Sequence, residues 1–490
     1  MTALLLNTAY FVVLTNILTV PQVGLVSLLN VVVISVATLS TLALPLIGSG
    51  TTATPPAVAR FLSGYTVKGP QRSVYLVSVA LCAAISLSLA YAMLHLLSGT
   101  AAASGSASAL LAASADSVAF SFAQLGAYSL VGLSRATLSG KLLVVAALLR
   151  YAFASALLLS GQGVAGVFAG FALGDASLAV ASNTFTVRSV LGKSSNMSPL
   201  RPVFSYMASV FASALVGLGV SQADRLVAFF QQGLGNLGVY NVAVVGASVA
   251  AFAPVSITNV LVPSLASEDG SEPRRRVLLN YTRYASLVAS PMGMGLAAVS
   301  PFLLRLFGDA YAAGAPVLAT IAVSVALTSV SSVYSSYLLA GSRAHMYLAG
   351  NILGLAALLT VSAVTAGSIG LEGVAAGRAA MLFVSLAAFA YFTRRDGFFV
   401  LDYKAYSRSL ISSAIMALIV FSLLYSAQAV LLHTRLAVVA ASILAIPAGL
   451  VLYLYTMKIL HGFSHSDFEF LERLLPAGLG WVARLASRLA

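Results

Sequence analysis

The chain has 490 residues, of which 60% are hydrophobic and only 8% are charged, and its formal net charge is +13. This composition excludes a soluble multidomain protein, because too little polar surface is present to keep such a chain in water. The positive charge could suggest a nucleic-acid partner, but the basic residues are distributed by loop. Membrane topology explains that pattern better, so we expect no nucleic-acid partner.

Apolar runs of about 18 to 25 residues recur along the whole sequence, and each is long enough to cross a bilayer as a helix. The runs do not alternate between polar and apolar residues, as the strands of a membrane β-barrel would. The sequence therefore predicts an all-α, polytopic membrane protein with about fourteen spans. In chain order these lie near residues 3–19, 23–47, 73–97, 108–132, 141–160, 163–186, 203–229, 238–262, 280–304, 314–339, 345–366, 371–392, 409–430 and 436–457.

Lysine and arginine residues gather in the loops that follow every second predicted span. These loops and the segment after the last span hold 21 of the 26 basic residues, and the loops after spans 1, 3 and 5 hold none. The positive-inside rule then places both termini in the cytoplasm, in a protein integral to the cell membrane. A single missed span would destroy this alternation, so the charges support the count independently.

Two glycine-rich stretches and the end of the chain carry further predictions. The sequences GQGVAG at 161–166 and GLGNLG at 233–238 match a nucleotide-binding pattern, but no strand precedes either of them. We therefore interpret their glycines as tight turns between helices. Residues 461–490 mix apolar, acidic and basic residues, which predicts a cytoplasmic interfacial amphipathic helix; a solvated tail is the alternative.

A short internal repeat connects the two halves of the chain. VPQVGLVSLLNVV near the first turn resembles LGNLGVYNVAVV after span 7, and Gly24 aligns with Gly238. An offset of six spans predicts two repeats in the same orientation, related by an axis along the membrane normal. We expect an N-terminal lobe at 1–200 (spans 1–6), a C-terminal lobe at 201–398 (spans 7–12), spans 13 and 14 at 399–460, and the tail at 461–490.

Several segments also resemble a known family in order and spacing. They are ADRLVAFFQQGLGNLGVYNVA, LVPSLASE, LFGDAYAAGAPVLATIAV, YLLAGSRAHMYLAGNILGLAALL and SIGLEGVAAGRAAMLF. The pattern is similar to that of polysaccharide-biosynthesis membrane proteins, the O-antigen and lipid-linked oligosaccharide flippases of the multidrug/oligosaccharidyl-lipid/polysaccharide exporter superfamily.

The resemblance implies two six-helix lobes around a central cavity that opens alternately to either side of the membrane. It implies translocation of lipid-linked oligosaccharide or polysaccharide precursors from the cytoplasmic to the outer leaflet. The expected partners are the lipid-linked glycan, membrane lipids and, as candidates, glycan-assembly enzymes, with the chain acting as a monomer. No cofactor is expected; H⁺ and Na⁺ are the candidate coupling ions.

Two other functions remain open. The same fold could serve a cation-coupled efflux transporter for drugs or small amphiphiles. A membrane glycosyl or phosphoglycosyl transferase would need acidic metal or catalytic clusters in sizeable loops, but the loops here are short. The histidines are scattered and only one cysteine is present, so we expect no catalytic residues, no metal site and no enzymatic activity.

Arg150 and Asp175 are the first candidates for the substrate-binding cavity. Arg150 lies nine residues beyond Lys141, about 13 Å into the membrane at the rise of an α-helix. Asp175 lies at a similar depth on the next span, so the two are predicted to meet as an ion pair. The hypothesis is that Arg150 exchanges Asp175 for a substrate phosphate; a permanent structural pair is the alternative.

Four further residues are weaker candidates. Asp224 and Arg225, near the outer end of span 7, are predicted to act in gating or ion coupling, with Arg225 extending to the interface; anchoring of the helix end is the alternative. Asp116, two turns before Gln124, is a candidate proton or cation site or else a hydrogen-bonded core group. Arg60 could meet headgroup phosphates at the substrate entrance or serve only to orient the chain.

Overall fold

The computed structural model describes residues 2–41, 71–98, 106–133, 135–191, 201–267, 271–340, 343–430 and 435–463. Throughout these ranges the regular elements are helices and no strand occurs, which confirms the predicted all-α class. Eleven helical segments in the same ranges are long and apolar enough to cross a membrane. Two of them, Ala136–Val190 and Ser213–Ala250, are interrupted by glycine turns, and the exact number of crossings stays a prediction.

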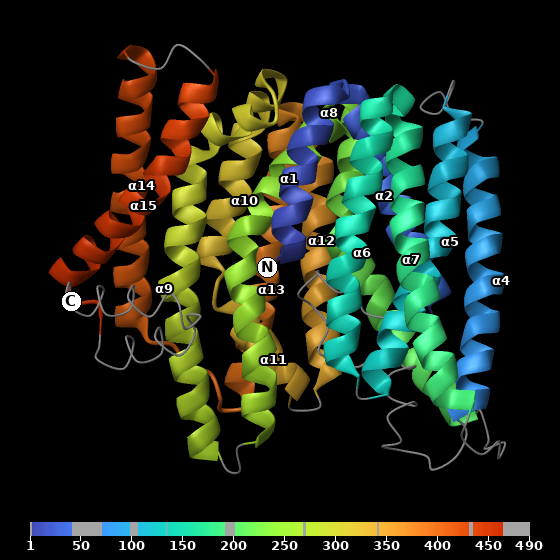
Figure 1. Ribbon diagram of the computed structural model, residues 1–490. Helices are drawn as coiled ribbons and strands as arrows, with labels where there is room; N and C mark the ends of the chain where they lie inside the picture. The colour runs from blue at the N-terminus through green and yellow to red at the C-terminus, as the bar shows by residue number, and fades with distance from the viewer. Residues whose placement is uncertain are drawn as a thin grey trace. The chain divides into compact units, whose positions relative to one another are not determined.

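The chain forms two compact units, Met1–Asn241 and Val242–Ala490. The first unit ends inside α8, the longest helical segment, so this boundary does not test the finer predicted division into four parts. Figure 1 shows the helices of the first unit, which are α1 (Thr2–Ile17), α2 (Val20–Ser40), α4 (Gln71–Ser98), α5 (Ala107–Gly132), α6 (Ala136–Leu157), α7 (Gly163–Leu191) and the part of α8 (Arg201–Ser267) up to Asn241.

Local sequence explains where these helices begin and turn. At the start of α2, the Gln22 side chain accepts a 3.0 Å hydrogen bond from the Thr19 backbone N–H, and Pro21 occupies the first turn, where its missing N–H costs nothing. Between α6 and α7, Gly161 has φ 86° and Gly163 has φ 56°; within α8, Gly233 has φ 77°. Because these backbone angles favour glycine, the predicted glycine turns are confirmed.

The two aligned glycines of the internal repeat lie against each other. A Cβ added to Gly238 would stand 3.1 Å from the Gly24 backbone N, which brings α2 and the second half of α8 into close contact. A second match between the halves starts at Gly163 (φ 56°, ψ −139°) and Gly370 (φ 64°, ψ −134°). The sequences that follow, GVAGVFAG and GLEGVAAG, both begin the second helix of a hairpin.

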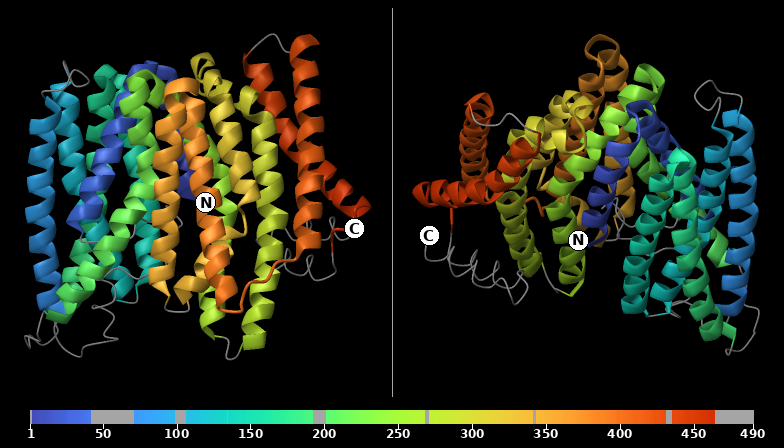
Figure 2. Two further views of the ribbon diagram at one scale, coloured as in Figure 1. Left: turned by 180° about the vertical axis from the view of Figure 1, so that it is seen from behind. Right: turned by 45° about the horizontal axis from the view of Figure 1, so that its top comes forward.

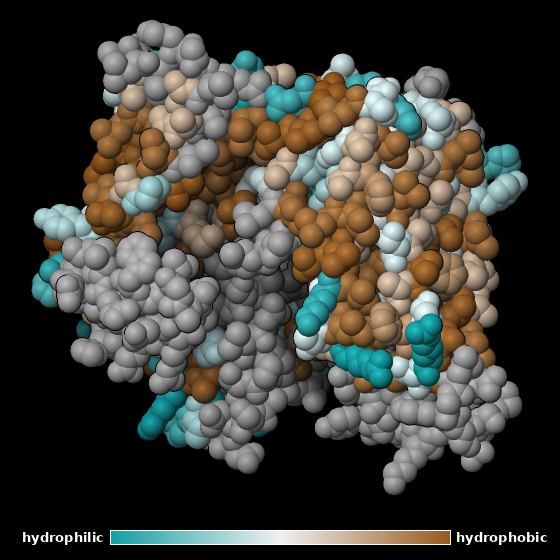
Figure 3. All heavy atoms as spheres, in the orientation of Figure 1, coloured by the Kyte–Doolittle hydropathy of each residue, from teal (hydrophilic) through white to brown (hydrophobic). Residues whose placement is uncertain are grey.

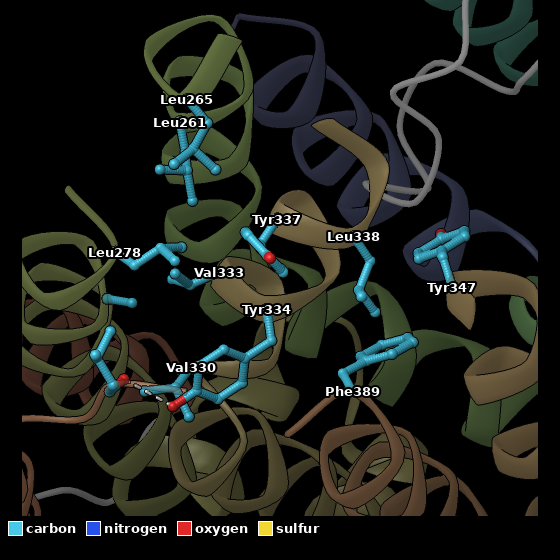
Figure 4. Packing of buried hydrophobic residues seen from close by; sticks show 12 residues of the cluster. Leu261, Leu265, Leu278, Val330, Val333, Tyr334, Tyr337, Leu338, Tyr347 and Phe389 are labelled. Carbon is cyan, nitrogen blue, oxygen red and sulfur yellow. Dashed lines mark hydrogen bonds between the residues drawn. The ribbon is translucent and has the colours of Figure 1, made fainter. Parts of the chain in front are cut away.

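The second unit contains the remaining helices. They are the rest of α8, α9 (Ser271–Leu303), α10 (Ala315–Leu327), α11 (Ser331–Ala340), α12 (Ala344–Ile369), α13 (Leu371–Arg395), α14 (Tyr403–Val430) and α15 (Arg435–Ile459), with short 3₁₀ turns at Leu304–Leu306 and Asp309–Gly314. Helices α12 and α13 run side by side along most of their length (Figure 2). Figure 4 shows one core of this unit, where Tyr347 and Phe389 stack with ring centroids 5.7 Å apart.

Helices α14 and α15 pack on α9 around a buried polar node. The Ser409 hydroxyl of α14 donates to the Ser286 carbonyl of α9 at 2.9 Å and lies 3.0 Å from the Tyr453 hydroxyl of α15. Tyr453 in turn donates to the Leu287 carbonyl at 3.0 Å. In an apolar surrounding each of these bonds fixes one helix to another, so the predicted spans 13 and 14 belong to the second unit.

The outward faces of the helices are strongly apolar. Leu96, Leu159, Val364, Leu444 and Phe230 are each at least 70% exposed. On the face shown in Figure 3, brown apolar side chains cover the lengths of the described helices and teal hydrophilic ones gather near their ends. A surface of this kind is solvated by lipid tails, and the chain is an integral membrane protein.

Candidate functional site: a buried ionic cluster in the first unit

A row of glycines brings α6 and α7 into close contact. Gly166, Gly170 and Gly174 recur every four residues and therefore share one face of α7. A Cβ at Gly170 would collide with the Ala154 backbone, and one at Gly174 would stand 2.6 Å from the Arg150 Cβ. Small residues at such spacing let helix backbones approach in a membrane. The next residue, Asp175, is thereby placed beside Arg150.

Arg150 and Asp175 form the predicted ion pair. The Arg150 Nη1 atom lies 3.1 Å from Asp175 Oδ2, which confirms that the two residues meet. The contact is not an aligned hydrogen bond, because Asp175 Oδ2 has no hydrogen-bond partner in the described part of the chain. An ion contact without this alignment is weaker than the bidentate pairs that arginine can form.

A second carboxylate stands beside the same arginine. Asp116 of α5 is 0% exposed, and its Oδ2 atom lies 3.9 Å from Arg150 Nη2. Neither oxygen of Asp116 accepts a hydrogen bond from any described residue. The cluster thus contains two carboxylates for one guanidinium. Gln124 is buried farther along α5, and its Oε1 atom also lacks a described partner.

Aromatic rings surround the guanidinium. The Arg150 Cζ atom lies 4.1 Å from the ring centroid of Phe171 and 5.4 Å from that of Phe120, within the range of cation–π attraction. Tyr10 of α1 stacks on Tyr151 of α6 at 5.1 Å. The rings cover much of the guanidinium and both carboxylates are buried, so the charges interact in a medium of low dielectric constant.

The guanidinium nevertheless keeps unused binding capacity. Its side chain is 17% exposed, whereas those of Asp116 and Asp175 are 0% and 5% exposed. Its Nε–H has no hydrogen-bond acceptor among the described residues. An arginine with a free donor, an unaligned ion contact and an exposed edge is suited to bind an anion with planar oxygen pairs, such as a phosphate.

Asp224 and Arg225 form a separate polar group across the Gly233 turn of α8. Asp224 is 0% exposed and accepts a 2.9 Å hydrogen bond from the Tyr240 hydroxyl. The Arg225 guanidinium donates to Asn241 Oδ1 at 2.8 Å and to Gln222 Oε1 and the Ser221 carbonyl at 2.9 Å each. Arg225 therefore binds its own helical hairpin, and its extension to the membrane interface stays a prediction. The structure gives both residues a role in fixing this turn; gating and ion coupling stay predictions.

Two predictions fall outside the described residues. Arg60 and the amphipathic tail at 464–490 belong to segments that the structure does not describe. The residues that sequence reasoning missed are those around the arginine, namely Phe120, Phe171, Tyr10 and Tyr151. The glycine row was a signal that could have found them, because it identifies the face of α7 that packs on α6.

The second unit offers an ion pair of another kind. Arg283 of α9 lies 2.7 Å from Asp402, which precedes α14, and also donates to the Gly462 carbonyl at 3.1 Å. Asp402 in turn accepts a hydrogen bond from the Ala405 backbone N–H at 3.0 Å. Each charged group here has an aligned partner, and the side chains are 19% and 25% exposed. This pair connects α9 to the two ends of the α14–α15 hairpin and leaves little capacity for a ligand.

Comparison with solved structures identifies the class of fold. The lipid II flippase MurJ, in an inward closed conformation, matches with a TM-score of 0.64 at 11% sequence identity, over 94% of this chain and 97% of that chain. An inward-facing multidrug resistance MATE transporter of the MOP superfamily matches with 0.61 at 17% identity, over 81% and 95%. An MOP superfamily transporter from Pyrococcus furiosus matches with 0.57 at 16% identity, over 80% and 92%. The chain has the fold of these transporters.

Sequence comparison adds one relative. The teichuronic acid biosynthesis protein TuaB of Bacillus subtilis is 30% identical over 176 residues, which is 35% of this chain and 36% of TuaB. The match therefore spans about a third of that protein's length. No known protein-family profile matches the chain. The chain therefore shares its fold with MurJ and the MATE transporters, and about a third of it is similar in sequence to a teichuronic acid biosynthesis protein.

Proposed function

We propose that this protein is a flippase that moves lipid-linked oligosaccharide or polysaccharide precursors from the cytoplasmic to the outer leaflet by alternating access. The observation that carries the proposal is the incompletely satisfied Arg150 in the membrane-embedded first unit. A guanidinium in such a place costs energy unless it has a use or a full set of partners. The fold of a lipid II flippase and the relation to a teichuronic acid biosynthesis protein support the same class of cargo.

In this mechanism Arg150 exchanges Asp175 for a phosphate oxygen of the lipid diphosphate. The Arg150 edge is exposed while Asp175 is buried, so the incoming anion approaches the arginine and not the carboxylate. The unaligned ion contact lowers the cost of the exchange, since the phosphate can form two aligned bonds where Asp175 forms none. The helices then move as packed bodies and carry the bound cargo across the membrane, without a covalent step and without enzymatic activity.

The proposal extends to topology and partners. Both termini lie in the cytoplasm, as the loop charges indicate, and the chain acts as a monomer with the lipid-linked glycan and membrane lipids as its partners. Glycan-assembly enzymes are candidate partners on the cytoplasmic side. The fold shared with MATE transporters favours a second candidate function, the cation-coupled efflux of amphiphiles.

A reconstituted assay separates the two functions. Proteoliposomes containing the purified chain are given a fluorescent lipid-diphosphate sugar or a cationic dye, each with and without a proton or sodium gradient. Flipping of the diphosphate lipid is expected, with at least a tenfold loss in Arg150→Gln, since about 1.4 kcal/mol of lost binding already corresponds to that factor. Dye export with no lipid flipping would establish the efflux function and reject the flippase.

A further inference from the structure

In the cluster around Arg150, the first unit has more buried negative charge than positive charge. Asp116 and Asp175 both face Arg150, at 3.9 Å and 3.1 Å, and no other described cation is within 4.0 Å of either carboxylate. With both carboxylates ionised the cluster would carry one uncompensated negative charge. An uncompensated charge in a dry site is costly, and such sites neutralise by binding a proton or a cation.

The geometry between the two carboxyl groups favours a proton. Both carboxylates lie within 4.0 Å of the same guanidinium, which makes them close neighbours. Both oxygens of Asp116 and the Oδ2 atom of Asp175 nevertheless have no hydrogen-bond donor in the described part of the chain. A proton on one carboxyl group supplies the missing hydrogen-bond donor and also removes the excess negative charge. A metal ion is less suited, because the described residues offer no group of three acidic, histidine or cysteine ligands.

No neighbouring titratable group among the described residues compensates the excess negative charge. The titratable side chains that face the cluster are Tyr10 from α1 and Tyr151 from α6, both neutral phenols at neutral pH. Helix α2, which also packs on α5, has no titratable residue in Val20–Ser40. On α4, Tyr75 donates to Asn183 at 2.7 Å, Cys82 is buried, and Tyr91 is in ring contact with His95 at 5.3 Å. The excess charge must therefore be resolved within the pair.

We propose that Asp116 and Asp175 share one proton while Arg150 is paired with them, and that an anion which draws Arg150 away makes the pair take up a second proton. The second half rests on the proposed function, because it needs a phosphate at Arg150. With Arg150 in the cluster, one proton brings the net charge of the two carboxylates and the guanidinium to zero. Without Arg150, two protons are needed to neutralise the two carboxylates. Binding of the anionic cargo is thereby linked to proton uptake from water, and its release returns the proton.

The shared proton is tested without any substrate. Infrared spectra of the purified full-length protein at neutral pH show whether a protonated carboxyl C=O band is present. Asp116→Asn and Asp175→Asn each leave one carboxylate for one guanidinium, so either variant is expected to lose the band. Arg150→Gln leaves two carboxylates without a cation, and the band is expected to grow about twofold. Asp402→Asn, which alters the one-to-one pair of the second unit, is the control and leaves the band unchanged.

The linkage is tested by calorimetry with a short-chain prenyl diphosphate as the probe, in buffers of different ionisation enthalpy. Uptake of about one proton per bound diphosphate is expected in the wild type and none in the double variant Asp116→Asn/Asp175→Asn, which has no carboxyl group left in the cluster. A missing C=O band, or a band that survives both aspartate variants, overturns the shared proton. Diphosphate binding without proton uptake overturns the linkage. If the diphosphate does not bind while the band behaves as expected, the proposed function fails and the shared proton stands.

Discussion

Both units contain arginine–aspartate contacts, and those of Arg150 and Arg283 differ in how completely their polar atoms are paired. Arg283 and Asp402 in the second unit stand one to one, at 2.7 Å, with further bonds to the Gly462 carbonyl and the Ala405 N–H. Arg150 in the first unit has two carboxylates, none of them in an aligned hydrogen bond with it, and its Nε–H has no described acceptor. The first arrangement suits a structural connection, while the second retains capacity for a ligand. The comparison shows that partner stoichiometry distinguishes the two better than burial alone.

The largest effect is expected where the cluster loses its cation. Arg150→Gln leaves Asp116 and Asp175 buried without a counter-charge, and breaking a buried pair from one side costs about 3–5 kcal/mol. The free energy of unfolding in detergent measures the loss. The folded variant binds one more proton at these carboxyl groups than the folded wild type does, so the deficit is expected to shrink as the pH falls. A deficit that is independent of pH would show that the carboxylates are not the cause.

The next effect tests the close contact of α6 and α7. Gly174→Ala places a methyl group against the Arg150 backbone, and overpacking of this kind costs about 1–3 kcal/mol. It should also separate Asp175 from Arg150 and reduce flipping. Gly217→Ala is the matched control, because a Cβ there has no atom within 4 Å. Equal stability losses in the two variants would contradict the packing argument.

An effect of comparable size is expected at the turn of α8. Tyr240→Phe removes the hydroxyl that donates to Asp224, and a hydrogen bond to a charged group contributes about 1.5–3 kcal/mol. Thermal unfolding measures this loss. Comparison with Asp224→Asn in the flipping assay shows whether the carboxylate does more than hold the turn. If Asp224→Asn flips normally under every ion gradient, gating and coupling at this position are both excluded.

The smallest effect is expected at the satisfied pair of the second unit. Asp402→Asn keeps the shape of the side chain and can still accept bonds from Arg283 and Ala405, and both charged groups are partly exposed. A loss of about 0–1 kcal/mol and unchanged flipping are expected. A loss as large as that of Arg150→Gln would show that the two pairs are equivalent and would remove the basis of the comparison.

The sequence predicts the helices and the central ion pair but not the surroundings of that pair. Hydrophobic length and loop charge define the spans, because a bilayer imposes both. The Arg150–Asp175 contact follows from equal depth on two helices joined by a short turn. The approach of Asp116 from α5 does not follow, because it depends on how a third helix is rotated about its axis. The contact of Arg225 with Asn241, sixteen residues later, does not follow either, because it depends on how the chain turns at Gly233.

The most direct measurement compares, in the flipping assay, two double variants that each replace both charged residues of an arginine–aspartate pair by neutral ones. Arg150→Gln/Asp175→Asn removes the charges of that pair together and leaves Asp116, which one proton neutralises. Arg283→Gln/Asp402→Asn removes both charges of the pair in the second unit, so neither variant leaves an arginine without its aspartate. Size-exclusion chromatography confirms that both are folded. Our account predicts that the first variant loses flipping of the lipid-diphosphate sugar and the second retains it. Wild-type flipping by folded Arg150→Gln/Asp175→Asn would show that the pair is only structural, and would contradict the role proposed for Arg150.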